Sequence, residues 1–216
     1  GHDHLIPMLG VWDNFEEIDF SEFPSKFILK TNHGSGWNIL VKDKKRFDYY
    51  GAKQKFNEWL KEDYSKRGGY ELHYAGISPK IIAEEYLGDP KDLFDYRFFC
   101  FDGVPRFIWV DSGSGTVEHR RNVYDIDWNL QPLMVNYQPL SANLPKPIQL
   151  DEMVECAKVL SKGFSFVRVD FYLVGETVYF GEMTFTPQSG IGKWDPPEAN
   201  KYYGDLINLP EARREL

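Results

Sequence analysis

The sequence is poor in cysteine, with two residues, Cys100 and Cys156, among 216. Neither belongs to a Cys-x-x-Cys spacing, so the sequence indicates neither a disulfide framework nor a zinc ribbon. Such sparing use of cysteine is typical of a reducing compartment. We therefore expect a cytoplasmic protein.

Long apolar runs are also missing. No stretch approaches the roughly 18–20 consecutive apolar residues that a membrane-spanning helix needs, and we recognise no signal peptide. The opening residues, GHDHLIPMLGVWDNFEEIDF, already have the character of folded sequence. We therefore expect that a natural N-terminal portion precedes this chain.

The chain lacks positive net charge, since its formal charge is -8. Proteins that bind the nucleic-acid backbone usually present a basic surface, so a nucleic-acid partner is disfavoured. Hydrophobic residues make up 42% and charged residues 27%, which is typical of a globular protein with a substantial core. The aromatic content of 16% suits a β-rich core.

Apolar alternation predicts several strands, and the turns Asp102–Gly103 and Gly175–Glu176 predict two hairpins. Apolar residues at helical spacing predict an amphipathic helix that ends at Gly68–Gly69. The mixture indicates an α+β or α/β sandwich. We expect a strand and an acidic turn within 5–20, strands at 27–30, 38–42 and 79–88, strand pairs within 95–113, 119–133 and 166–190, and helices within 48–68, 144–164 and 196–216.

The stretch FILKTNHGSGWNILVK places Lys30 at the end of a strand, followed by the tight loop His33-Gly34-Ser35-Gly36. Glycine lets backbone N–H groups approach phosphate oxygens, and a nearby lysine supplies charge. The loop leads into a strand and lacks the P-loop pattern. On these residues alone, a phosphate loop and a plain turn are equally good interpretations.

The stretch IIAEEYL places Glu84 and Glu85 at the end of an apolar strand. Side chains alternate along a strand, so one of the two carboxylates must point away from the core. The segment is either a solvated strand end or a hinge that contacts the adenine and ribose of a nucleotide.

The hairpin FVRVDFYLVGETVYFGEMTFTPQSG carries Arg168, Asp170 and Glu182 within apolar strands. Paired strands bring Asp170 and Glu182 near one another on one face, and Arg168 shares that face. Two carboxylates side by side suit Mg²⁺, which takes few protein ligands and keeps water and phosphate oxygens. The alternative is a salt-bridged triad. Similarly, Arg120 and Arg121 either grip an anion or form a solvated basic turn.

Taken in order, these segments resemble the ATP-grasp superfamily, and more closely its TupA-like branch, found with bacterial surface-polysaccharide and teichuronopeptide synthesis. The resemblance runs from about Leu5 to Leu209. It implies an α+β ATP-grasp fold, in which two α+β subdomains grip ATP between antiparallel sheets. Residues 1–24 would form a lead-in, 25–87 the small subdomain with the phosphate loop, and 88–216 the large subdomain with the magnesium and acceptor sites.

The resemblance also implies roles for single residues. Of the two implied catalytic residues, Lys30 would match the lysine that reaches the ATP phosphates, and Arg168 the arginine that steadies the transferred phosphoryl group or acyl phosphate. Many relatives carry Asn where this chain has Thr184, whose hydroxyl is a weaker magnesium ligand. The implied ATP contacts are Lys30, His33, Gly34, Ser35, Gly36, Lys42, Glu84, Glu85, Tyr86 and Leu87; the implied Mg²⁺ ligands are Asp170, Glu182 and Thr184; and the residues expected to hold an acidic acceptor are Arg120, Arg121 and Lys193.

The implied activity is ATP- and Mg²⁺-dependent ligation of a carboxylate to an amine through an acyl phosphate. The expected partner is an acidic acceptor, either a small molecule or a polysaccharide. Two alternatives remain open: a kinase that phosphorylates a sugar hydroxyl, and a non-catalytic nucleotide-binding module of a polysaccharide-assembly complex.

Overall fold

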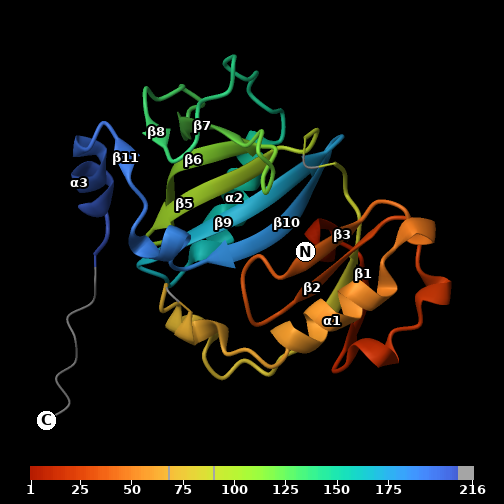
Figure 1. Ribbon diagram of the computed structural model, residues 1–216. Helices are drawn as coiled ribbons and strands as arrows, with labels where there is room; N and C mark the ends of the chain where they lie inside the picture. Colours follow the sequence, from red (N-terminus) through yellow and green to blue (C-terminus); the bar gives the residue numbers. More distant parts are fainter. Residues whose placement is uncertain (68, 90, 209–216) are drawn as a thin grey trace, which may run out of the picture. The chain divides into compact units, whose positions relative to one another are not determined.

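The computed structural model describes residues 1–67, 69–89 and 91–208 (Figure 1). The chain forms two compact units, which we call the small unit (Ile6–Leu87) and the large unit (Gly1–Leu5 with Gly88–Leu216). Throughout the described residues, every helix is too short or too polar to cross a membrane. The last part of the range 196–216, in which we expect a helix, lies at 209–216, outside the described residues.

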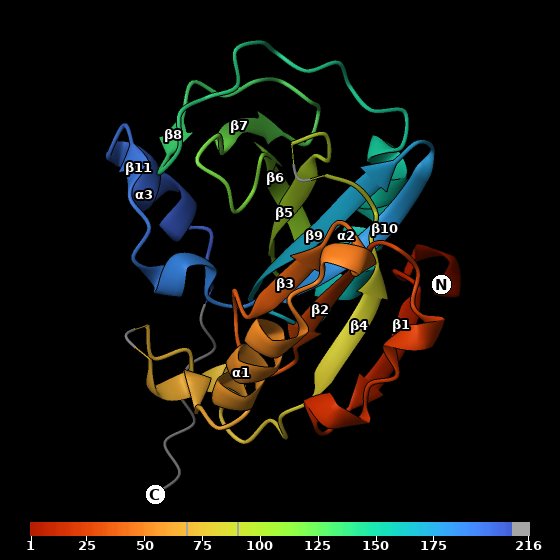
Figure 2. The same ribbon diagram turned by 45° about the vertical axis from the view of Figure 1, so that its right-hand side comes forward.

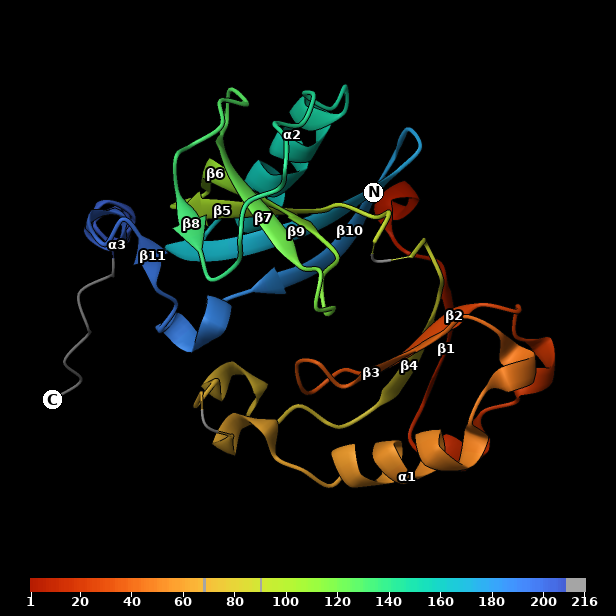
Figure 3. The ribbon, with the colours of Figure 1, turned by 45° about the horizontal axis from the view of Figure 1, so that its top comes forward.

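The small unit is built on a four-stranded antiparallel sheet of order β1-β4-β2-β3 (Figure 2). Helix α1 (Tyr49–Trp59) runs along one face of this sheet (Figure 3). Short 3-10 turns connect the elements. The strands are β1 (Met8–Trp12), β2 (Phe27–Thr31), β3 (Asn38–Val41) and β4 (Ile81–Glu85), and the turns are η2 (Phe15–Glu17), η3 (Phe20–Glu22), η4 (Lys44–Arg46), η5 (Tyr64–Lys66) and η6 (Leu72–Tyr74).

The core of the small unit lies between the sheet and α1. Strand residues Phe27 and Leu29 are fully buried, and Phe56 of the helix packs in the same cluster. The alternate side chains of β2 are half-buried on the other face, as the period of two requires. One face of the sheet is therefore closed by the core, and the other carries the polar groups described below.

Helix α1 confirms the predicted amphipathic helix but ends at Trp59, earlier than the predicted end at Gly68–Gly69. Its N-cap is Asp48, whose carboxylate accepts a hydrogen bond from the Gly51 N–H at 2.9 Å. Beyond the helix, the carboxylate of Asp63 accepts from the Ser65 hydroxyl at 2.6 Å and from its N–H at 3.2 Å. This aspartate caps the separate turn η5, so the chain leaves the helix before the glycines.

The large unit contains a five-stranded antiparallel sheet of order β10-β9-β5-β6-β7. Helix α2 packs on one face over a core that includes Phe98, Ile108, Val169 and Met153. The elements are η1 (His2–His4), β5 (Asp95–Phe101), β6 (Val104–Ser112), β7 (Arg120–Asp125), β8 (Met134–Val135), α2 (Leu150–Ser161), β9 (Phe166–Val174), β10 (Thr177–Thr184), η7 (Pro187–Gly190), β11 (Trp194–Asp195) and α3 (Glu198–Gly204).

Both predicted hairpins are confirmed. Strands β5 and β6 meet at Asp102 and Gly103, whose φ angles of 48° and 76° fit a two-residue turn that matches the twist of the strands. Strands β9 and β10 meet at Gly175–Glu176, where Gly175 has a φ of 61°.

The predicted strand pair within 119–133 is only half present, because β7 is followed by a turn and a single bridge from Tyr124 to Leu130. Trp128 has a φ of 70°, and its ring stacks on Tyr124 with 4.3 Å between centroids. The Trp128 indole N–H donates to the Leu144 carbonyl at 3.0 Å. This packing holds the segment after β7 in a turn, although the alternation of apolar residues predicted a second strand there.

Candidate functional site

On the small unit, Lys30 and Glu84 form an ion pair across strands β2 and β4, with 2.7 Å between Nζ and Oε2. The register pairs Lys30 with Ile82 and Ile28 with Glu84, so the two charged residues share the face that lies away from α1. Their side chains are 33% and 17% exposed. A partly exposed ion pair of this kind contributes little stability, so either partner is able to exchange it for a ligand.

The glycine loop between β2 and β3 has a fixed base. The Asn32 side chain donates to the Ser78 carbonyl at 3.0 Å and accepts from the Lys80 N–H at 2.7 Å. A Cβ atom on Gly34 would overlap the ring of Trp37, so this position requires glycine. Gly36 has a φ of 75°, in the region that favours glycine.

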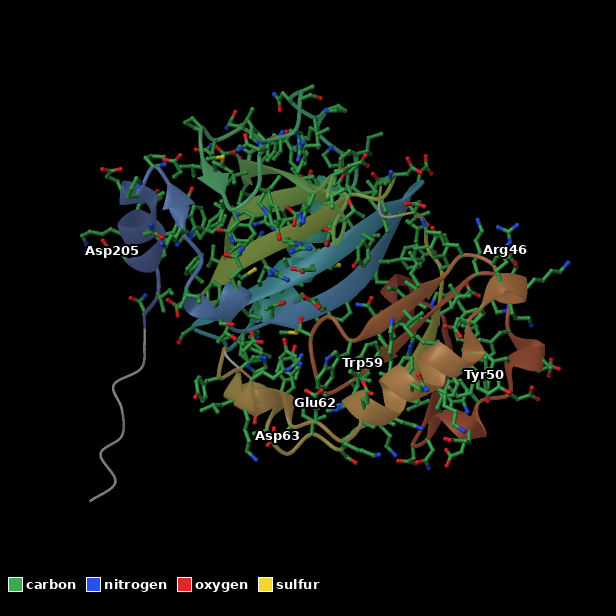
Figure 4. The ribbon with its side chains drawn as sticks, in the orientation of Figure 1. Arg46, Tyr50, Trp59, Glu62, Asp63 and Asp205 are labelled. Atoms are coloured by element: carbon green, nitrogen blue, oxygen red, sulfur yellow. The ribbon has the colours of Figure 1, made fainter. Side chains whose placement is uncertain are left out.

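His33 points into the small unit and is 3% exposed. Its Nε2 lies 2.9 Å from the carbonyl oxygen of Trp59, the last residue of α1, which Figure 4 labels. The imidazole also packs against Trp37, with 5.1 Å between ring centroids. His33 therefore anchors the loop, while Ser35 and Gly36 at its tip are exposed.

The segment after β4 carries the predicted hinge residues. Glu85 is exposed, and its N–H donates to the Pro7 carbonyl at 2.9 Å. The Tyr86 ring lies 5.5 Å from Lys26 Nζ, and Leu87 is half-buried. Lys42 follows β3 and lines a groove of about 470 Å³ between that strand and the start of α1.

On the large unit, Arg168 joins the two carboxylates of the β9–β10 hairpin. Its Nε and Nη2 donate to the two oxygens of Asp170 at 2.7 and 2.5 Å, and Nη2 also donates to Glu182 Oε1 at 2.7 Å. The Thr184 hydroxyl donates to the same Glu182 oxygen at 2.8 Å. The expectation that these charged residues share one face of the hairpin is therefore confirmed.

A β-bulge in β10 brings Glu182 opposite Asp170. Val174 pairs with Thr177 at the turn, and continuing that register would place Gly181 opposite Asp170. The register shifts between Phe180 and Glu182, so that Glu182 becomes the partner of Asp170. Without the shift, Glu182 would point to the opposite face of the sheet, which α2 covers.

Arg97 lies at the centre of the polar face of the large sheet and was missed by the sequence interpretation. Its Nη2 lies 2.5 Å from Asp95, and its Nε lies 3.2 Å from Asp111 and 3.8 Å from Asp170. The sequence signal was available in DYRFFCF and FIWVDS, where charges interrupt apolar strands. The register Asp170–Arg97–Trp109 brings these strands together.

Arg121 is 2% exposed and serves the structure of the large unit. It donates from Nε and Nη2 to the two oxygens of Asp111 at 2.5 and 2.6 Å, and from Nη1 to the Val135 carbonyl at 3.3 Å. Its guanidinium lies 3.9 Å from the centroid of the Trp109 ring. These contacts occupy the side chain, which contrasts with its predicted role in holding an acceptor.

Arg120 and Lys193, the other two predicted acceptor residues, are exposed. Arg120 Nη1 donates to the carbonyl of His119 at 3.1 Å. Successive residues on a strand face opposite ways, so Arg120 and Arg121 do not act as a pair.

Electrostatics differ between the two buried aspartates of the polar face. Burial raises the pKa of Asp170 to about 7, and Arg168 only partly opposes this rise. Burial also acts to raise the pKa of Asp111. However, hydrogen bonds from Arg121 and His119, together with the positive charge of Arg97, hold this pKa well below its usual range. Asp111 is therefore the more firmly ionised of the two.

A family model described as TupA-like ATP-grasp matches residues 1–208. The chain belongs to the TupA-like ATP-grasp family. The resemblance inferred from the sequence is thereby confirmed, and so is the α+β ATP-grasp fold class. A search of curated proteins by sequence gives no significant match.

Several solved structures are similar to this TupA-like chain at low identity. An L-amino acid ligase from Bacillus licheniformis superposes with a TM-score of 0.53 and 14% identity, over 88% of this chain and 41% of that chain. A D-alanine–D-alanine ligase from Bacillus anthracis complexed with ATP gives a TM-score of 0.48 and 16% identity, over 94% and 59%. The ATP-grasp ligase PsnB, complexed with minimal precursor, Mg and ADP, gives a TM-score of 0.41 and 10% identity, over 94% of this chain and 54% of that chain. The TupA-like chain thus spans between 41% and 59% of the length of these chains.

The carboxylates of the large unit have the right chemistry for Mg²⁺. Glu182 has a side chain that is 61% exposed, whereas that of Asp170 is 4% exposed and both its oxygens bind Arg168. Across the described ranges of the chain, no group of three or more His, Cys, Asp or Glu side chains is arranged to hold a metal ion. Mg²⁺ needs only one or two protein carboxylates when phosphate and water complete its shell, so the donor set fits this ion in a nucleotide complex.

Proposed function

We propose that this TupA-like protein is an ATP- and Mg²⁺-dependent carboxylate–amine ligase that acts through an acyl phosphate. Its acceptor would be an acidic sugar or a glutamate-type carboxylate in bacterial surface-polysaccharide synthesis, and its compartment the cytoplasm. The observation that carries the proposal is the pairing of Asp170 with Glu182 across β9 and β10, joined by Arg168, in a member of an ATP-grasp family.

In the small unit, Lys30 is the proposed phosphate ligand. A phosphate oxygen would take the place of Glu84 beside its ammonium group, at an ion pair that is already partly exposed. The backbone N–H groups of Ser35 and Gly36 are proposed to bind phosphate at the tip of the loop, with the His33 side chain fixing its base. Lys42 adds positive charge after β3, and Glu84 to Leu87 would contact adenine and ribose.

In the large unit, Glu182, Asp170 and Thr184 would hold Mg²⁺. When bound with ATP, the ion neutralises the charge of the phosphate oxygens. Arg168 is already positioned by two carboxylates and would steady the transferred phosphoryl group. The exposed side chains of Arg120 and Lys193 remain the proposed contacts of an acidic acceptor, whereas we assign Arg121 a structural role.

The test of nucleotide binding uses Glu182→Gln, because Glu182 is exposed and its loss leaves the buried Arg168–Asp170 pair intact. We expect calorimetry to show Mg-ATP binding by the wild type and binding at least about tenfold weaker in the variant. Glu176→Gln, at the exposed turn of the same hairpin, is the matched control and should bind as the wild type does. Absence of Mg-ATP binding by the wild type would exclude the proposed function.

Turnover separates the proposed ligase from other ATP-grasp activities. With candidate acids, ATP and hydroxylamine, a ligase releases ADP and yields a hydroxamate, because hydroxylamine intercepts the acyl phosphate. A kinase acting on a sugar hydroxyl would yield a stable phosphoester instead. Binding of Mg-ATP without turnover of any tested acceptor would favour a non-catalytic module.

A further inference from the structure

A pocket of about 290 Å³ lies within the large unit, on the sheet face opposite α2. Buried aromatic residues of β5 and β6 form one side, and the segment after β10 forms the other. In the sheet register, Phe99 of this pocket pairs directly with Arg168. The lining residues are Phe99, Phe101, Phe107, Trp109, Phe166, Phe185, Thr186, Pro187, Gln188, Gly190, Gly192, Trp194, Asn200, Tyr203, Gly204 and Ile207.

The lining selects against charged ligands. None of the described residues that line the pocket carries a charged side chain, and the polar ones are a few amides and hydroxyls such as Gln188, Asn200 and Tyr203. Transferring an unpaired carboxylate or phosphate into such surroundings is costly, whereas a flat apolar group packs well against aromatic rings. The pocket therefore fits a neutral ring.

Trp109 adds a specific requirement. It is 2% exposed, and among the described residues its Nε1–H has no hydrogen-bond partner. One face of the indole is covered by Arg121, with 3.9 Å from the guanidinium to the ring centroid. The buried Trp128 on the opposite sheet face, by contrast, donates its indole N–H to the Leu144 carbonyl. A buried donor without a partner lowers stability and is satisfied by a ligand that brings an acceptor.

We propose that this pocket binds a neutral six-membered ring that carries a hydrogen-bond acceptor oxygen. The ring packs among the aromatic side chains, and its oxygen accepts a hydrogen bond from Trp109 Nε1–H. The volume lies at the lower end of the range for small-molecule sites, which suits one ring. A phenol and a pyranose share this chemistry. Because the pocket adjoins Arg168, the bound ring would be the uncharged part of the ligase acceptor. This link to the acceptor rests on the proposed function, whereas the binding of a ring does not.

The test follows the tryptophan indole N–H resonances of the intact chain by ¹H–¹⁵N NMR, without nucleotide. The probes are 4-methylphenol, methyl β-glucopyranoside and toluene, which has a similar ring without oxygen. We expect 4-methylphenol or the glucoside to move the Trp109 resonance downfield, and whichever does so identifies the source of the ring. Toluene should leave this resonance without a downfield shift, and the Trp128 resonance should not move with any probe.

Two variants separate the hydrogen bond from ring packing. Trp109→Phe should weaken binding of the active oxygen-bearing probe about 3- to 10-fold and leave toluene unchanged. Phe185→Ala, at the partly exposed mouth, should weaken all ring probes alike. The proposal is overturned if no probe shifts the Trp109 resonance of the wild type, or if toluene binds as tightly as the oxygen-bearing probes. Since ATP takes no part, neither result bears on the Mg-ATP experiment.

Discussion

The Lys30–Glu84 pair of the small unit has side chains that are 33% and 17% exposed, whereas those of Arg121 and Asp111 in the large unit are 2% and 0% exposed. Both pairs cross neighbouring strands on the sheet face away from the covering helix. Only the second is bidentate, with two hydrogen bonds of 2.5 and 2.6 Å. The two sheets thus use ion pairs of different kinds in equivalent places.

The difference separates structural charges from those available to a ligand. Removing one partner of a buried pair leaves the other desolvated and unpaired, so such a pair is costly to break. A partly exposed pair loses little when water or a ligand replaces one partner. We infer that Arg97, Asp111 and Arg121 maintain the polar sheet face of the large unit, whereas Lys30 and Glu182 are the more exposed of the charged groups proposed to bind the nucleotide and its Mg²⁺.

The largest expected effect is on stability. Asp111→Ala leaves Arg121 buried without its carboxylate and should lower the free energy of unfolding by about 3–5 kcal/mol. Glu84→Ala, the matched change in the small unit, should cost no more than about 1 kcal/mol. Urea unfolding followed by tryptophan fluorescence measures both. Similar losses for the two variants would contradict the distinction between the pairs.

The contribution of Asp111 to the free energy of unfolding should depend on pH. The pKa of Asp111 is held below its unfolded value, so its contribution to stability is complete above that value, roughly 4. The contribution is lost as the pH falls below 4 toward the folded pKa. We therefore expect the stability difference between the wild type and Asp111→Asn to shrink between pH 6 and pH 3. A constant difference over this range would argue against the depressed pKa.

Asp170 does not obscure this comparison. Its pKa is raised to about 7, so its contribution to stability decreases as the pH rises from about 4 through 7, the opposite sense. Arg97 contacts both aspartates, so their contributions are coupled, and the comparison is decisive below about pH 4, where Asp170 is protonated in both folded proteins.

Replacing Lys30 should weaken Mg-ATP binding and leave the free energy of unfolding almost unchanged. Lys30→Ala removes a charge-assisted contact worth about 1.5–3 kcal/mol, so we expect Mg-ATP affinity to fall about 10- to 100-fold. The free energy of unfolding should change by less than about 1 kcal/mol, since the pair with Glu84 is partly exposed. Calorimetry and urea unfolding of the same sample give both values.

Lys61→Ala is the matched control for Lys30, because Lys61 is an exposed lysine just beyond α1, the helix that covers the other face of the small sheet. It should bind Mg-ATP as the wild type does. Equal losses of affinity in the two variants would mean that lysine charge in general, and not the position of Lys30, governs binding.

Local patterns were sufficient to predict the hairpins. The period of two places Arg168 and Asp170 on one face of β9, and the turn at Gly175–Glu176 brings β10 beside them. The same period indicates that Arg120 and Arg121 face opposite ways, so only one of them could be exposed. The bulge between Phe180 and Glu182 has no comparable sequence signal, although it decides which face Glu182 occupies.

Contacts between distant segments were not predictable. Arg97 meets Asp111 and Asp170 only because β5 lies between β6 and β9, and no local pattern fixes this strand order. His33 turns inward because Trp59, at the end of α1, offers its carbonyl. In both cases the partner lies more than ten residues away along the chain.

The smallest expected effect compares two exposed loops, one in each unit. Gly36 and Gly115 have φ angles of 75° and 77°, and a Cβ atom would meet nothing within 4 Å at either position. Alanine at each should therefore cost about 1 kcal/mol of stability through backbone strain alone. Only Gly36→Ala should also weaken Mg-ATP binding, by about 3- to 10-fold, because strain at the tip displaces the N–H groups proposed to contact phosphate. If Gly115→Ala weakened Mg-ATP binding equally, the loss would reflect general strain, and the glycine loop would be a plain turn.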